Sequence, residues 1–276
     1  MKKIGTVTQK RIFDCITFFN ENFITNVRFE ILDPIVDFFI ICESIYDHKG
    51  NKKSINFKLK NIKFKKKIIH IILKDKFPQP TDPWKNQRLQ REKILEKLKN
   101  CKKNDYIMFS DPDEIPNPNV LKNFFLNKKY GIFLQKHFVY KINLKNQYED
   151  PWEGTRITRK KDLFSIDYIR QKVLRKNLKY PFWRIDKEKN IQIFKNGGWH
   201  FNNLMTPEDI SLKIKTFAHS EYNKKDFFDI NLIKKKILER KDLYNQNRVF
   251  NKVPIVKKNY PNYILNNLNK FINFIA

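Results

Sequence analysis

Short apolar segments alternate with longer amphipathic segments through the first half of this 276-residue chain. The apolar segments have the length of β-strands and cover residues 11–19, 37–42, 68–73 and 106–110. Residues 82–99 and 118–127 have helical periodicity, and residues 23–32 fit a helix or an irregular turn. Strands that alternate with helices predict an α/β fold with a mostly parallel sheet flanked by helices.

The second half of the chain has a different pattern. Residues 131–144 predict antiparallel strands, and residues 192–194 and 198–201 predict two short ones. Helices are expected at 207–217 and 227–240. Residues 264–275 carry apolar side chains on one helical stripe, which fits packing on the domain or contact with a membrane surface.

The net charge of +28 invites a nucleic-acid interpretation, but the composition argues against it. Of the 57 basic residues 46 are Lys, and Lys is over-used together with Asn, Ile and Phe, as an AT-rich coding sequence produces. The lysines are also spread along the whole chain. We therefore expect no nucleic-acid partner, although a basic nucleic-acid-binding protein stays an alternative.

The sequence predicts neither a membrane-spanning segment nor a signal peptide. No apolar run approaches the roughly 20 residues that a spanning helix needs, and no apolar stretch follows the basic start. The three cysteines, Cys15, Cys42 and Cys101, are odd in number and none forms a C-x-x-C pair. Buried free thiols are therefore expected, which favours a reducing, cytoplasmic location.

The most specific local feature is an acidic cluster directly after the apolar segment 106–110. Asp111, Asp113 and Glu114 lie within four residues, followed by Pro116. In α/β sheets ligands bind at the carboxyl ends of strands, and grouped carboxylates repel one another unless a cation is present. The pattern predicts a site for a divalent cation and a diphosphate, with an exposed acidic loop as the alternative.

Three further features supply candidate residues. His200 follows Gly197-Gly198-Trp199 and fits either a core residue or a contact to metal or phosphate. Arg88 and Arg91 are three residues apart on a predicted helix, so they share a face that could bind an anion or simply be solvated. Glu43 follows a buried strand and is a candidate for hydrogen bonds to a nucleoside.

Several motifs in fixed order give the chain a resemblance to a known family. The motifs are Ile12-Phe13-Asp14-Cys15, Phe19-Asn20-Glu21, residues 36–44 with Tyr46, His48 and Gly50, Gln90-Arg91, residues 110–116, Trp152 with Gly154-Thr155-Arg156, residues 197–201, and residues 217–219 with Glu221-Tyr222. Over roughly residues 11–222 the chain strongly resembles glycosyltransferase family 17.

The resemblance implies a GT-A-like fold, a nucleotide-sugar donor (UDP-N-acetylglucosamine in the known member), manganese, or magnesium in its place, and inversion at the anomeric carbon. It implies that Asp111 and Asp113 hold the metal and diphosphate. His200 is added to these two as a candidate metal ligand from its own sequence context. The residues assigned to donor binding are Asp14, Glu43, Ser44, Arg88, Arg91, Asp111 and Trp199. One domain is expected, with a donor half at 1–127, an acceptor half at 128–225 and a helical extension at 226–276.

Catalysis is assigned to Asp113 and to a general base. Glu153 is favoured as the base because Trp152 beside it could stack on an acceptor sugar, while Asp150, Glu114 and Glu221 stay alternatives. Pro112 departs from the family pattern, which has a small apolar residue between the two acids. The expected acceptor is a glycan or lipid-linked glycan, with peripheral contact to an anionic membrane as an option. A catalytically inactive sugar-binding relative is the third interpretation.

Overall fold

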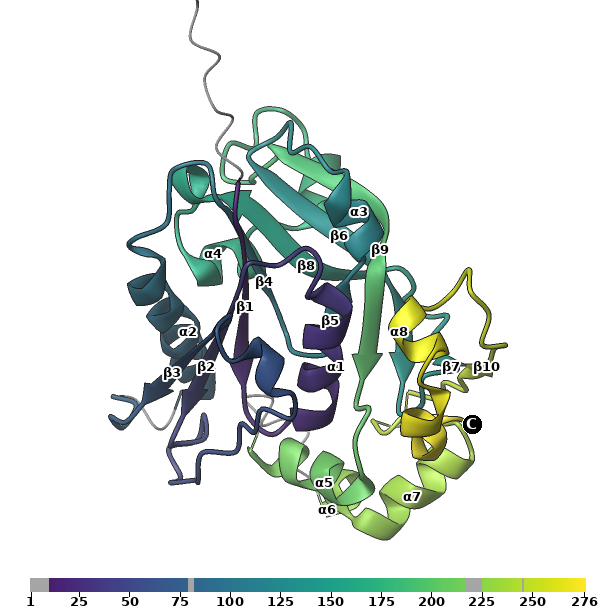
Figure 1. Cartoon of the computed structure of the whole chain (residues 1–276). Coiled ribbons are helices and arrows are strands. Elements are labelled where there is room, and N and C mark those ends of the chain that lie inside the picture. The colour runs from purple at the N-terminus through teal and green to yellow at the C-terminus, as the bar shows by residue number, and fades with distance from the viewer. Residues whose placement is uncertain (1–9, 79–81, 217–224, 245) are drawn as a thin grey trace, which may run out of the picture.

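The computed structural model describes residues 10–78, 82–216, 225–244 and 246–276. A single ten-stranded sheet runs through the molecule, with helices packed on both of its faces (Figure 1). In the order β10-β7-β6-β8-β4-β1-β2-β3 each strand is hydrogen-bonded to the next, and β9 joins both β6 and β5.

The first half of the chain builds the parallel part of this sheet. β1 (Ile12–Phe18) lies between β2 (Phe38–Ser44) and β4 (Tyr106–Ser110), and β3 (Ile68–Leu73) pairs with β2, all in parallel. The segment that fitted either a helix or a turn is helix α1 (Asn22–Leu32). The predicted strands and the parallel order of this half are confirmed.

The second half makes the sheet mixed, in line with the antiparallel strands expected there. β8 (Trp152–Arg159) lies antiparallel between β4 and β6 (Tyr130–Val139), in a stretch where no strand was predicted. β7 (Leu144–Lys145) and β6 are antiparallel, as predicted. The two short strands expected at 192–201 are one long strand, β9 (Ile191–Asn202), which runs parallel to β6 and antiparallel to β5 (Glu114–Pro116).

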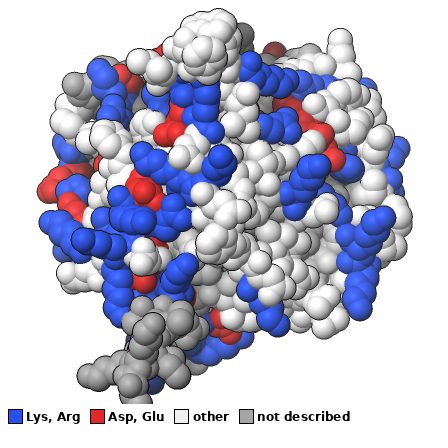
Figure 2. All heavy atoms as spheres, turned by 90° about the horizontal axis from the view of Figure 1, so that it is seen from above, with Lys and Arg blue, Asp and Glu red and all other residues white. Residues whose placement is uncertain are grey.

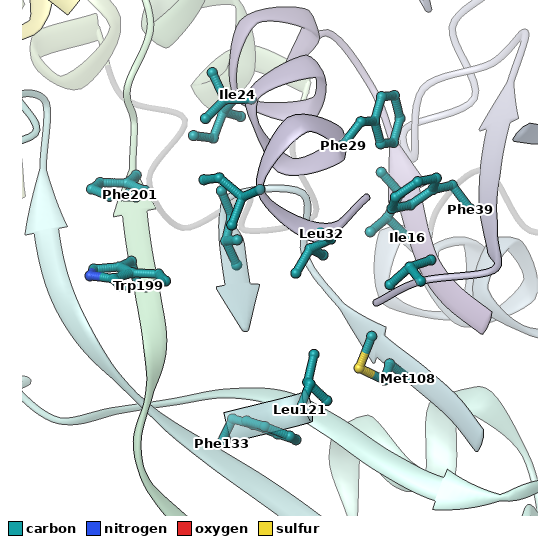
Figure 3. Packing of buried hydrophobic residues seen from close by; sticks show 14 of the residues in the cluster. Ile16, Ile24, Phe29, Leu32, Phe39, Met108, Leu121, Phe133, Trp199 and Phe201 are labelled. Atoms are coloured by element: carbon teal, nitrogen blue, oxygen red, sulfur yellow. The ribbon is translucent and has the colours of Figure 1, made fainter. Parts of the chain in front are cut away.

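Side chains alternate along the strands and enter two apolar cores, one on each face of the sheet. In β1, Ile12 and Ile16 enter the core under α1, and Phe13 and Cys15 enter the opposite core. Figure 3 shows the first of these, where Phe29 of α1 packs near Phe39 of β2. The opposite core is covered by the 3-10 helix η2 (Lys93–Leu98) and by α4 (Ile166–Gln171). Cys15 and Cys42 are buried free thiols as predicted, and Cys101 is half-buried and free.

The helix predicted over residues 82–99 is α2 (Pro83–Glu92) continued by η2. Asp82 caps its start by accepting a hydrogen bond from the backbone N–H of Lys85. The buried face of α2 is polar and consists of Asn86, Gln87, Gln90 and Arg91, whereas Leu89 is exposed. Polar side chains face inward here because α2 borders a polar cavity. Residues 118–127, predicted as one helix, form only the short α3 (Pro118–Lys122).

Residues 225–244 and 246–276 pack onto the same sheet. They contain α6 (Lys225–Phe228), α7 (Ile230–Leu238), β10 (Asn251–Lys252), α8 (Asn262–Leu265) and the 3-10 helix η6 (Leu268–Phe274), and α5 (Pro207–Thr216) precedes them. The helix predicted at 264–275 is thus split into two. Ile264 and Phe271 are buried in the core under α1, so the stripe packs on its own domain, and only Ile272 is largely exposed. No helix of the described residues is long and apolar enough to cross a membrane.

Candidate active site at the acidic loop

The acidic loop that follows β4 rests on a buried arginine. Arg28 of α1 donates through Nε and Nη2 to the two carboxylate oxygens of Asp14, at 2.7 and 2.6 Å. Its Nη2 also donates to Ser110 Oγ at 2.7 Å, and its Nη1 donates to the carbonyl oxygen of Glu114 at 2.6 Å. Arg28 and Asp14 are shielded from solvent, so this pair fixes the backbone of the loop from below.

Strand β9 holds the same loop from the side. Glu114 pairs with His200 in the sheet, and the N–H of Phe201 donates to the carbonyl oxygen of Asp113 at 2.9 Å. Gly198 has φ of +136°, and a Cβ atom there would lie 2.1 Å from the carbonyl oxygen of Ile115. Only glycine allows this approach, so the Gly-Gly pair serves the contact between β9 and the acidic loop.

On its open side the loop meets a second arginine. Arg170 of α4 donates to Asp111 Oδ2 at 2.6 Å and to both carboxylate oxygens of Glu114, at 2.9 and 3.1 Å. Trp152 Nε1 also donates to Glu114 Oε1 at 2.7 Å. Burial would lower the pKa of Arg170, but the charges of Asp111 and Glu114 outweigh it and raise that pKa. Glu114 is fully buried and fully paired, which argues against it as a general base.

Asp113 faces the other wall of the site. Its Oδ1 lies 3.6 Å from His200 Nε2, and its Oδ2 lies 3.9 Å from Lys213 Nζ of α5. Burial alone would raise the pKa of Asp113, but the charge and hydrogen bond of His200, together with Lys213, lower it below its usual value. Asp113 is therefore an ionised carboxylate at neutral pH.

His200 belongs to an aromatic stack. Its ring lies 4.5 Å from that of His137 and 4.7 Å from that of Trp152, measured between centroids. Burial and the charge of His200 lower the pKa of His137 to about 2, so His137 is neutral. Within the described part of the chain, His200 Nδ1 and both ring nitrogens of His137 have no hydrogen-bond partner.

A cavity of about 520 Å³ lies at the carboxyl ends of the parallel strands and is lined by Asp111, Asp113, Trp152, Arg170, His200 and Lys213. Its walls come from segments far apart in sequence: residues 17–19 at the end of β1, residues 46–48 after β2, the acidic loop, and side chains of α2, α4, α5, β8 and β9. Arg91 lines it from α2 and donates to Asp167 Oδ1 at 2.9 Å. Gln90 Oε1 accepts a hydrogen bond from His48 Nε2 at 2.7 Å. The cavity therefore combines four carboxylates, those of Glu21, Asp47, Asp111 and Asp113, with several cationic groups.

The side chains at the acidic loop suit only a divalent cation that needs few ligands from the protein. Among the described residues no three His, Cys, Asp or Glu side chains group as metal ligands, so the expected set of Asp111, Asp113 and His200 is not formed. The reason is that His200 turns its Nε2 toward Asp113, and Asp111 is paired with Arg170. Two carboxylates still suit magnesium or manganese, which bind through one or two carboxylates and take their other ligands from phosphate and water.

Comparison with known sequences decides the family. The profile of glycosyltransferase family 17 matches residues 4–271, nearly the whole chain. The chain belongs to glycosyltransferase family 17. It is accordingly a glycosyltransferase, and the resemblance seen in its motifs is confirmed.

Other comparisons add little to the family 17 assignment. No curated protein matches the chain. HddC from Yersinia pseudotuberculosis aligns at 12% identity with a TM-score of 0.35, covering 68% of this chain and 92% of that chain. A glycosyltransferase involved in the glycosylation of the major capsid of PBCV-1 aligns at 10% identity with a TM-score of 0.30, covering 67% of this chain and 81% of that chain. Likenesses this distant say nothing about donor or acceptor.

Five of the residues expected to act in this family 17 enzyme line the cavity. They are Asp111, Asp113, Arg91, Trp152 and His200. Arg91 is nearly buried, whereas Arg88, expected beside it, is mostly exposed and only 3.8 Å from Asp167 Oδ2. Arg88 is absent from the cavity wall because α2 turns that face to solvent.

Four residues assigned to donor binding are buried outside the cavity, so these assignments are corrected. Asp14 lies beneath the acidic loop with both oxygens bound by Arg28. Glu43 is buried and accepts hydrogen bonds from the backbone N–H groups of Asn56 and Phe57 and from Lys53 Nζ. Ser44 accepts from the N–H of Tyr46. Trp199 points into the core beside Phe201 (Figure 3), and its Nε1 donates to the carbonyl oxygen of Asn259 at 2.6 Å. All four residues support the walls of the cavity from outside it.

The favoured base lies in a different cavity from Asp111 and Asp113. Glu153 lines a second cavity, of about 520 Å³, whose wall is made by residues 148–153 together with Arg156, Arg170, Leu174 and Arg175. Its carboxylate accepts from the N–H of Arg175 at 3.0 Å and lies 3.5 Å from Arg156 Nη2. The alternative Asp150 lies in the same cavity, and Glu221 lies outside the described residues.

The residues that sequence reasoning missed are Arg28, Arg170 and Lys213. Arginine is scarce, with 11 in the chain, and this scarcity singled out Arg88 and Arg91. The same criterion could have drawn attention to Arg28 and Arg170. Lys213, by contrast, is one of 46 lysines, and no local pattern separates it from the others.

Proposed function

We propose that the enzyme transfers a sugar from a nucleotide-diphosphate donor to a hydroxyl group of a glycan or a lipid-linked glycan. Inversion in a single displacement and assistance by Mn²⁺ or Mg²⁺ are part of this proposal. The observation that carries it is the placement of Asp111 and Asp113 in a cavity at the carboxyl ends of parallel strands. The proposed donor is UDP-N-acetylglucosamine, which rests on the family alone.

The donor diphosphate is proposed to lie against the acidic loop. Asp111 and Asp113 would hold the cation, which when bound offsets the negative charge on the leaving diphosphate. Lys213 and Arg91 line the same cavity and can stabilise phosphate oxygens directly. Because Asp113 is buried and ionised at neutral pH, its carboxylate suits a cation better than an acceptor proton.

The acceptor is proposed to occupy the second cavity, which meets the first at Trp152 and Arg170. Its charged lining residues are balanced: the acids Glu149, Asp150 and Glu153 and the arginines Arg156, Arg170 and Arg175. A balanced, hydrogen-bonding wall with the aromatic rings of Trp152 and Tyr148 suits an uncharged sugar. Trp152 thus keeps its predicted acceptor role in this proposal.

A screen of nucleotide sugars for hydrolysis with Mn²⁺ tests the proposal without knowledge of the acceptor. For the preferred donor, Asp113→Asn and Asp111→Asn should each lower turnover at least about 100-fold. The control is Asp186→Asn, which removes an exposed acid that lies outside both cavities. Near-normal turnover by Asp113→Asn, with unchanged urea unfolding, would show that this site does not hold the diphosphate.

A further inference from the structure

Three large apolar side chains project into solvent from the loop between the 3-10 helix η4 (Arg175–Lys179) and β9. Phe182 is 86% exposed, Trp183 is 65% exposed and Ile185 is 94% exposed. Single exposed apolar residues are ordinary, but a contiguous group of large ones marks an interaction surface. We call these three residues the apolar tip.

The loop that carries the apolar tip is ordered by its own contacts. Lys189 Nζ donates to the carbonyl oxygens of Pro181, Phe182 and Arg184, at 2.5, 3.2 and 3.1 Å. The guanidinium of Arg184 donates twice to the Asp186 carboxylate, at 2.7 and 2.8 Å, and lies 5.2 Å from the centre of the Tyr180 ring. These contacts fix the backbone while the three apolar side chains stay outside.

The surroundings of the apolar tip are strongly basic. Residues 172–189 contain seven Lys or Arg and two acids. In Figure 1, β9 runs downward from the top of the molecule, so the loop before it lies at the top. Figure 2 views that end from above and shows that Lys and Arg predominate over Asp and Glu there. An apolar tip within a basic surface complements a partner that is anionic outside and apolar beneath.

We propose that this loop docks the protein onto an anionic lipid surface. Phe182, Trp183 and Ile185 enter the interface between headgroups and acyl chains, and the surrounding Lys and Arg contact the headgroups. A second copy of the chain is a poorer occupant because each copy carries a charge of +28. Single-stranded RNA could stack on Phe182 and Trp183, but Ile185, the most exposed of the three, has no ring for a base to stack on.

The sheet register places the apolar tip away from the donor cavity. Tyr130 pairs with both Ile191 and Thr158, and Thr158 pairs with Ile107 near the start of β4. The loop before Ile191 therefore lies at the amino edge of β4, whereas Asp111 follows its carboxyl end. Docking would leave the donor cavity open to solvent, so this inference does not depend on the proposed sugar transfer.

Co-sedimentation with lipid vesicles tests the proposal. Wild-type protein should pellet with vesicles of phosphatidylcholine mixed with phosphatidylserine, and much less with phosphatidylcholine alone. The double variant Phe182→Ser/Trp183→Ser should bind the mixed vesicles at least about tenfold more weakly, because the inserted apolar area is lost. The matched control is Leu238→Ser, which removes an apolar side chain that is 83% exposed on α7 and should bind like wild type.

Added salt separates insertion from simple charge attraction. Salt screens the lysines spread over the surface, so wild type should keep a residual affinity at high salt that the double variant lacks. Equal binding by wild type and the double variant, or no binding of wild type to mixed vesicles, would overturn the proposal. A loss of RNA binding or a change of oligomeric state in the double variant, without vesicle binding by wild type, would assign the tip to the other occupants.

Discussion

The two sides of the acidic loop are built from the same chemistry and serve different ends. Below the loop, Arg28 and Asp14 form a pair that no solvent reaches. On the open side, Arg170 pairs with Asp111 and Glu114 at the border of the cavity, and Asp111 keeps about a third of its side-chain surface exposed. An arginine enclosed by protein stabilises the loop, whereas one that borders a cavity can also meet a ligand.

This difference predicts whether replacing each arginine lowers mainly the stability of the fold or mainly the activity. A charge left alone in the protein interior has no water to compensate it, so breaking the lower pair should cost stability. On the open side water can enter from the cavity, so the same change should cost less stability and more activity.

The largest effect is expected for Arg28→Met, which leaves Asp14 buried without its partner. The free energy of unfolding should fall by about 3–5 kcal/mol, measured by urea denaturation. The double variant Arg28→Met/Asp14→Leu removes the stranded charge and should recover part of this loss. A loss below about 1 kcal/mol in the single variant would mean that the pair does not support the loop.

A smaller loss of stability, about 2–3 kcal/mol, is expected for Arg170→Met, because Glu114 keeps the hydrogen bond from Trp152. Hydrolysis of the donor should fall about tenfold or more, since Asp111 loses the group that holds its carboxylate. The matched control is Arg175→Met, at the half-exposed edge of the second cavity, which should leave donor hydrolysis unchanged. A greater loss of stability for Arg170→Met than for Arg28→Met would reverse the comparison.

A pH effect is expected from His48 in the cavity wall. Burial lowers the pKa of His48 to about 4, below its usual value of 6.5, so the folded protein keeps this ring neutral. Because the unfolded chain protonates His48 at a higher pH than the folded protein does, the free energy of unfolding falls as the pH drops from 6.5 toward 4. The loss is about 2 kcal/mol at pH 5. Urea midpoints at pH 7 and pH 5 should therefore differ less in His48→Asn than in wild type. The same difference in both proteins would contradict a buried neutral His48.

The smallest effect is expected for Glu153→Gln. Glu153 lines the second cavity and is half-enclosed by Arg156 and Arg175, so its loss should change stability by less than about 0.5 kcal/mol. Hydrolysis of the donor in the absence of acceptor should stay near the wild-type rate. A loss of donor hydrolysis comparable to that of Asp113→Asn would restore Glu153 to the catalytic centre.

Local sequence patterns gave correct predictions where the segment that shows the pattern also forms the predicted feature. The apolar run 106–110 with Asp111 and Asp113 behind it predicted a strand and a site at its carboxyl end, and both acids line the cavity. β8 gave no such signal, because Glu153 and Arg156 interrupt its apolar residues. Arg156 is hydrogen-bonded to the carbonyl oxygen of Glu153 in the same strand, and Trp152 to the Glu114 carboxylate of β5.

Predictions of site residues failed where the role of a side chain depends on contacts with other segments of the chain. Glu43 and Trp199 stand beside the predicted site in sequence, but alternation along their strands turns them away from the cavity. Arg170 lies 59 residues from Asp111 in sequence, and only the packing of α4 against the sheet brings the two together. Sequence patterning thus determined the family, the parallel half of the sheet and the acidic loop, because those depend on neighbouring residues. Only the tertiary structure decided which charges enclose that loop, because ion pairs form between segments that the chain itself keeps far apart.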